Sequence, residues 1–74
     1  MNDLDLVILA EDLPEKGLRE GDVGTLVFVH EGGAAYEVEF VTLDGETVGV
    51  VTLQAAQVRP VGRRQIAHAR TVVG

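Results

Sequence analysis

Residues 18–27 (Leu-Arg-Glu-Gly-Asp-Val-Gly-Thr-Leu-Val) place two glycines at the entry to a run of apolar and β-branched side chains. Glycine adopts positive φ angles at little cost, so Gly21 allows a sharp turn immediately before the run begins. The β-branched residues that follow favour an extended strand. The stretch therefore predicts a tight turn that leads into the wall of a small antiparallel sheet.

The length and composition of the chain limit how such a sheet can be stabilised. Seventy-four residues supply one domain with a small core, and the absence of cysteine excludes disulfides and thiolate metal sites. Packing or oligomerisation must then stabilise the fold. The start of the chain is acidic and the apolar run at residues 6–10 is too short to cross a bilayer, so we expect a soluble, cytoplasmic protein.

The clearest strand alternates apolar and charged residues. Tyr36, Val38 and Phe40 fall on one face, and Glu37 and Glu39 fall on the other. A period of two is that of a strand with one face in the core and one in water. We therefore expect the aromatic rings inside and the two carboxylates outside.

The same reasoning predicts four more strands and the turns between them. Asp44-Gly45 indicates a two-residue type I′ hairpin turn, in which both residues have positive φ, and Gly49 indicates a bulge. Residues 11–22 form a long loop that Leu13 and Leu18 attach to the core. The predicted strands are residues 6–9, 23–30, 35–43, 46–53 and 57–61.

This order of strands predicts an all-β fold, a small five-stranded SH3-like barrel over residues 1–61. Closure of the barrel would bury the first strand on both sides. Residues 62–74 form a basic C-terminal arm. Its spacing of Ile66, Ala69 and Val73 is compatible with a helix, and Thr71-Val72-Val73 is equally compatible with a strand.

Four motifs together resemble a known family. The motifs are Gly21-Asp22-Val23-Gly24-Thr25, Tyr36-Glu37-Val38-Glu39-Phe40, Asp44-Gly45 and Val58-Arg59-Pro60-Val61. They are similar to the short bacterial proteins grouped as domain-of-unknown-function family 4926, over about residues 4 to 61. The resemblance implies a free-standing bacterial SH3-like domain with no catalytic residues to carry over. KOW-like and Tudor-like modules are more distant analogues of the fold alone.

The residue types needed for catalysis or metal binding do not converge in the sequence. Serine and cysteine are absent, and the threonines are placed as strand formers. His30 and His68 lie in different segments with no second ligand at a metal-binding spacing. Glu37 and Glu39 are better explained as an outward acidic stripe than as an acid/base pair. We therefore predict no enzymatic activity, no metal, no cofactor and no small-molecule substrate.

Charge is strongly divided along the chain, whose formal net charge is −6. Residues 1–46 hold all twelve carboxylates with only Lys16 and Arg19, whereas residues 47–74 hold four arginines and no acid. Such a division predicts that the basic end docks on an acidic surface, either its own, that of another copy, or that of a partner.

We therefore expect a non-catalytic protein-binding module. It would act by self-association, as a homodimer for example, or as an acidic accessory or antitoxin-like partner of another bacterial protein. The alternative is a KOW-like nucleic-acid-binding barrel that uses the C-terminal arginines, although the overall acidity disfavours it. The residues predicted to bind the partner, besides the loop at residues 11–22, are Glu37, Glu39, Glu46, Arg59, Arg63, Arg64 and Arg70.

Overall fold

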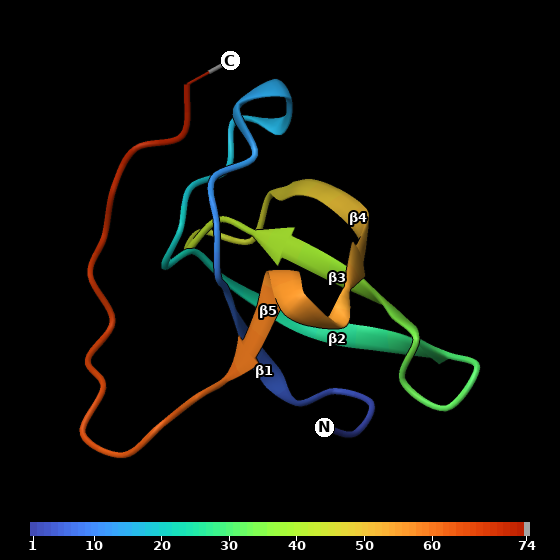
Figure 1. Cartoon of the computed structure of the whole chain (residues 1–74). Helices are drawn as coiled ribbons and strands as arrows, with labels where there is room; N and C mark the ends of the chain where they lie inside the picture. The colour runs from blue at the N-terminus through green and yellow to red at the C-terminus, as the bar shows by residue number, and fades with distance from the viewer. Residues whose placement is uncertain (74) are drawn as a thin grey trace.

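The strands expected from the sequence form one antiparallel sheet in the computed structural model of the chain, which describes residues 1–73 (Figure 1). The sheet has five strands in the order β4-β3-β2-β1-β5. Short 3-10 helices occupy the β1–β2 loop and the β4–β5 connection. The elements are β1 (Leu6–Leu9), η1 (Pro14–Lys16), β2 (Val23–His30), β3 (Ala35–Val41), β4 (Thr47–Gln54), η2 (Ala55–Gln57) and β5 (Val58–Pro60).

The all-β class is confirmed, but the sheet is not closed into the expected barrel. β4 and β5 are the two outer strands of the order, and no ladder joins them among residues 1–73. β5 has only three residues, all of which pair with β1. It ends at Pro60, which has no backbone N–H to donate to a further strand. The result is a curled, open sheet with an inner and an outer face.

The inner face of the sheet holds the core. Leu13 and Leu18 in the β1–β2 loop pair with each other and pack into this core, as expected. Their burial fixes the loop over one end of the sheet. The buried cluster consists of Val7, Leu9, Leu13, Leu18, Leu26, Val38, Phe40, Leu53 and Val58.

Gly24 lies on β2 directly against side chains of the neighbouring strand β3. A Cβ atom at this residue would lie 2.5 Å from Val38 Cγ1, 3.0 Å from the carbonyl oxygen of Glu39 and 3.0 Å from Phe40 Cε1. No real Cβ atom has room there. The second glycine of the entry motif therefore allows β3 to pack against β2, whereas Gly21, with φ of 94°, forms the turn before it.

The hairpin between β3 and β4 differs from the predicted type I′ turn. Gly45 has φ of 95°, but Asp44 does not have positive φ. The N–H of Gly45 donates to the carbonyl of Thr42, and the Asp44 carboxylate accepts a hydrogen bond from the Thr42 hydroxyl. A single left-handed glycine after a turn gives a longer, bulged hairpin. Phe40 pairs with Gly49 and Val41 pairs with Thr47, so Val48 of β4 is the extra residue, and the bulge predicted near Gly49 is confirmed.

The C-terminal arm, described over residues 62–73, is neither helix nor strand. It turns once at Arg63–Arg64, where the Gln65 side chain accepts a hydrogen bond from the N–H of Gly62. It then runs back past the sheet toward the β1–β2 loop (Figure 1, red segment). The sequence is compatible with a helix or a strand in the arm, and the structure has neither over residues 62–73. Among residues 1–73, no strand lies beside the arm to pair with it, and the arm has too few apolar residues for a stable isolated helix.

We predict that Gly24→Ala lowers the free energy of unfolding by about 1–3 kcal/mol, because an added methyl group overpacks the core. For a domain of this size, each kcal/mol corresponds to about 4–8 °C in melting temperature. Thermal unfolding followed by circular dichroism measures the change. The matched control is Gly49→Ala, since a Cβ atom there meets nothing within 4 Å. Equal destabilisation by both substitutions would contradict the packing argument.

Candidate functional site

A long groove lies between the outer face of the sheet and the arm. We call it the arm groove. Its volume is about 1360 Å³, larger than the roughly 300–1,000 Å³ typical of small-molecule pockets. Apolar side chains contribute from both sides, with Leu6, Ile8 and Val23 on the sheet and Ile66 and Val72 on the arm. Its length and apolar lining suit an extended segment of polypeptide.

Ile8 shows that the outer side of β1 is buried although the sheet is open. It points away from the core cluster, yet only 5% of its surface is exposed. Barrel closure was expected to cover this side of the first strand, but the sheet is open. Ile8 instead lies between Val23 and Arg59 on the neighbouring strands and lines the arm groove.

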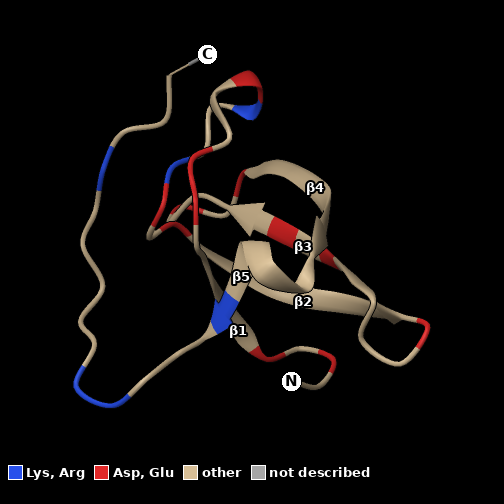
Figure 2. Cartoon of the chain, in the orientation of Figure 1, with Lys and Arg blue, Asp and Glu red and all other residues tan. Residues whose placement is uncertain are grey.

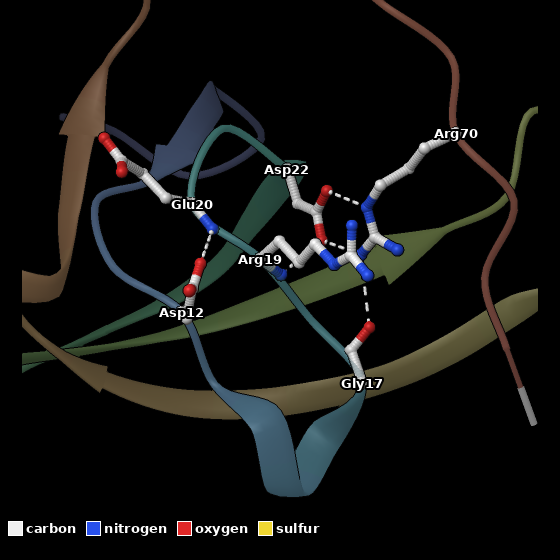
Figure 3. Close-up of polar contacts among 6 residues, drawn as sticks. All are labelled: Asp12, Gly17, Arg19, Glu20, Asp22 and Arg70. Atoms are coloured by element: carbon white, nitrogen blue, oxygen red, sulfur yellow. Dashed lines mark hydrogen bonds and ion pairs between the residues drawn. The ribbon is translucent and has the colours of Figure 1, made fainter.

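Arg70 attaches the arm to the body of the protein (Figure 3). Its Nε donates a hydrogen bond to Asp22 Oδ1 at 2.8 Å, and its Nη2 contacts both Asp22 Oδ2 and, at 3.1 Å, the carbonyl oxygen of Gly17. The two-point contact between guanidinium and carboxylate is the strong geometry for such a pair. The exposed fractions of the Asp22 and Arg70 side chains are 17% and 25%, so most of the pair is shielded from water.

Asp22 is held in place by the loop that contains it. Its carboxylate accepts a hydrogen bond from the N–H of Arg19 at 2.8 Å, and its own N–H donates to the Arg19 carbonyl at 3.0 Å. Its carbonyl accepts from the N–H of Leu9 at 2.9 Å, which ties it to the end of β1. The loop is also closed by Asp12, which accepts the N–H of Glu20 at 2.9 Å. The carboxylate is thus presented in a fixed orientation to the arm.

Two cations favour the ionised form of Asp22. Burial opposes ionisation of this carboxylate, but the hydrogen bonds from Arg70 and from the Arg19 N–H, together with the charges of both arginines, outweigh it. The pKa of Asp22 therefore lies below its ordinary value. The same contact raises the pKa of Arg70. Figure 3 shows the Asp22 carboxylate with its dashed contacts to Arg70, and the loop that carries Arg19 beside it.

A smaller hollow of about 280 Å³ lies where the arm meets the loop. It is lined by Asp12, Pro14, Gly17, Arg19, Arg70 and Val73. Its lining holds one carboxylate, Asp12, and two arginines, of which Arg70 is already paired with Asp22. We treat it as the end of the arm's contact with the body.

Two of the predicted acidic residues lie on the outer face of β3 (Figure 2) and are engaged within the sheet. Glu37 contacts His30 Nε2 at 2.6 Å and accepts hydrogen bonds from the Thr52 hydroxyl at 2.9 and 2.8 Å. The hydrogen bonds from His30 and then Thr52 lower the pKa of Glu37. Glu39 accepts a weaker hydrogen bond from Thr47 at 3.3 Å. Neither carboxylate lines the arm groove.

The other predicted binding residues divide between the groove and its surroundings. Glu46, Arg59 and Arg70 line the arm groove. Arg63 and Arg64 lie at the exposed turn of the arm and do not line it. Figure 2 shows basic residues along the arm and on β5, and both acidic and basic residues in the β1–β2 loop.

Asp22 is the acid that pairs with Arg70, and the sequence alone does not single it out. It was included only within the loop at residues 11–22, as one acid among several. Arg70 is 48 residues away, and no local pattern links the two positions. The only sequence signal is the division of charge, which predicts an intramolecular or intermolecular contact without naming the acid.

Within residues 1–73, no group of three or more His, Asp or Glu side chains is arranged to hold a metal ion. No helix in the same part of the chain has the length and apolar character needed to span a membrane.

Comparison with known proteins identifies the family. The family described as "Domain of unknown function (DUF4926)" matches residues 3–60, from before β1 to the end of β5. The chain belongs to this family. The DUF4926 match covers the whole sheet and Asp22 but ends before the arm. No curated protein and no solved structure matches the chain.

We predict that Arg70→Ala raises the pKa of Asp22 toward its ordinary value, because the substitution removes both hydrogen bonds and the nearer positive charge. A carboxyl-carbon NMR titration of the two proteins measures this shift. Arg63→Ala removes the same charge from the arm outside the groove, so it should leave the Asp22 titration unchanged. An unaltered pKa in Arg70→Ala would contradict the ion pair.

The direction of this shift also sets a pH dependence. Because the pKa of Asp22 is lowered in the folded chain, its stabilising contribution is fully present above the pKa of the unfolded chain. The contribution is lost as the pH falls through the lower folded-state value. In the Arg70→Ala protein this part of the acid dependence of stability should be reduced.

Proposed function

We propose that the chain is a non-catalytic protein-binding module whose arm groove receives an extended peptide segment carrying an arginine. The observation that carries this proposal is the arm itself, which lies along the groove and places Arg70 on Asp22. A bound segment of this type would be recognised by apolar contacts along the groove and by one two-point ion pair at its end.

Three features of the groove support a polypeptide occupant over a small molecule. Its volume exceeds that of ordinary ligand pockets, apolar side chains line it from both the sheet and the arm, and the segment that borders it, the arm, is itself an extended stretch of chain. Asp22 supplies the charge that selects a basic residue. Together these features suit a segment that is apolar and basic, as the arm is. The location proposed with this function is the cytoplasm.

Nucleic-acid binding through the C-terminal arginines is the competing proposal, and the arrangement of the arginines disfavours it. Arg70 is already paired with Asp22, which removes one of the four cations from any phosphate contact. The remaining C-terminal arginines, Arg59, Arg63 and Arg64, belong to a chain whose formal net charge is −6. Affinity for phosphate backbones rises with the number of free cations, so few contacts give weak binding.

A synthetic peptide with the sequence of residues 62–74 tests the proposal directly. We expect this peptide to bind the full-length Arg70→Ala protein, whose own arm has lost its contact with Asp22. Fluorescence anisotropy of the labelled peptide measures the binding. A peptide with Arg70→Ala should bind at least about tenfold more weakly, because it lacks the ion pair with Asp22. Asp22→Asn in the protein should weaken the native peptide similarly.

Two results would decide against this function. Equal binding of both peptides would remove Arg70 and Asp22 from recognition, and no binding of either would remove the groove as a peptide site. A labelled oligonucleotide provides the contrast in the same assay. Binding that weakens steeply with salt and disappears in Arg63→Ala/Arg64→Ala would favour the nucleic-acid function instead.

A further inference from the structure

The arm contacts its own body through few groups. Among its described residues, Arg70 is the one that donates side-chain hydrogen bonds to the body. Ile66 and Val73 remain 93% and 87% exposed. The groove beneath the arm is wide, so the arm lies along the outer face without close packing over most of its length.

The opposite wall of the groove is also incompletely covered. Leu6, Val23 and Val41 lie on the outer face of neighbouring strands, and between about two fifths and three fifths of each side chain's surface is exposed. Leu43, in the adjoining hairpin, is 93% exposed and lines the same groove. One copy of the chain thus leaves apolar surface uncovered on the arm and on the sheet face beside it.

From these observations, and resting on the proposed function, we infer that the arginine-bearing segment received by the arm groove is the arm of a second copy of this chain. Two copies would exchange arms reciprocally, each placing Arg70 on the partner copy's Asp22. A two-fold exchange uses the same contact twice and closes on itself, which favours a dimer over an open chain.

The length of the arm permits this exchange. Nine residues connect Pro60 to Arg70, and an extended chain of that length spans about 30 Å. The protein measures 33 × 29 × 21 Å along its principal axes. The arm can therefore reach across a neighbouring copy to its Asp22 as well as back to its own.

Charge and stability favour a second copy over an unrelated occupant. The basic arm of one chain meets the acidic loop of the other, so the charge division of the sequence becomes complementary across the interface. A domain with so small a core also gains stability when association covers its exposed apolar surface.

Charge-swap complementation in the full-length chain distinguishes exchange from self-contact. Asp22→Arg alone and Arg70→Asp alone each place like charges at the contact, so each protein should be monomeric at concentrations where the native chain is a dimer. In a one-to-one mixture, the native Arg70 of one protein meets the native Asp22 of the other. The substituted residues meet in the second contact, and a dimer should return.

Sedimentation equilibrium or light scattering measures the molecular mass. Each single-swap protein should have the 7.9 kDa mass of one chain, and the native chain and the one-to-one mixture should have twice that mass. Arg63→Asp makes the same charge change on the arm outside the groove and should leave the native dimer intact. If a swapped protein does not fold, Asp22→Asn and Arg70→Gln remove the attraction with little change in size. Each should then raise the dimer dissociation constant at least about tenfold.

Three results would overturn the inference. A native chain that stays monomeric at millimolar concentration excludes exchange. So does a one-to-one mixture of the two single-swap proteins that stays monomeric while the native chain dimerises. A dimer that persists in both single-swap proteins places the interface elsewhere. Failure of this inference is distinguishable from failure of the proposed function, because the arm peptide would still bind the Arg70→Ala protein if the groove receives segments from other proteins.

Discussion

A single curled sheet has two faces, and this chain carries apolar side chains on both. The inner face is filled by one layer of core residues, and the missing side chain of Gly24 allows β2 and β3 to close over that layer. The open edges at β4 and β5 leave the outer face without a second sheet. Within residues 1–73, the arm is the segment that runs along this face, and the arm groove lies between them. The groove and the placement of Arg70 both follow from this arrangement.

The ion pair between Arg70 and Asp22 converts an unstructured tail into a located one. Extended segments with few apolar contacts are ordinarily disordered, because their conformational entropy exceeds the gain from scattered contacts. A two-point, partly buried pair concentrates the attraction at one position, and the loop hydrogen bonds hold the Asp22 carboxylate ready for it. Because the arm is attached mainly through Arg70, the rest of the arm can adjust its position. Such an arrangement suits recognition of a segment through one arginine.

The sequence predicted the sheet well because its signals are local. The alternation around Val38, the β-branched run after Gly21 and the proline at the end of β5 each act within a few residues. The β3–β4 turn was predicted less well, because the Thr42–Asp44 side-chain contact stabilises a bulged hairpin that the dipeptide alone does not specify. The closed barrel was not found, since closure depends on a distant strand pairing. The site was only half predicted: Arg70 was named and Asp22 was not, because a contact over 48 residues has no periodic signature.

The docking of the arm through Arg70 is the central claim, and the side-chain Nε–H proton of that residue reports on it most directly. In an arginine-selective ¹H–¹⁵N NMR experiment, the Nε–H of Arg70 should exchange slowly with water and show a nuclear Overhauser effect to the β-protons of Asp22. The Nε–H groups of Arg63 and Arg64, at the exposed turn, serve as internal references. Rapid exchange of the Arg70 proton at the rate of those references, with no cross-peak to Asp22, would contradict the docked arm.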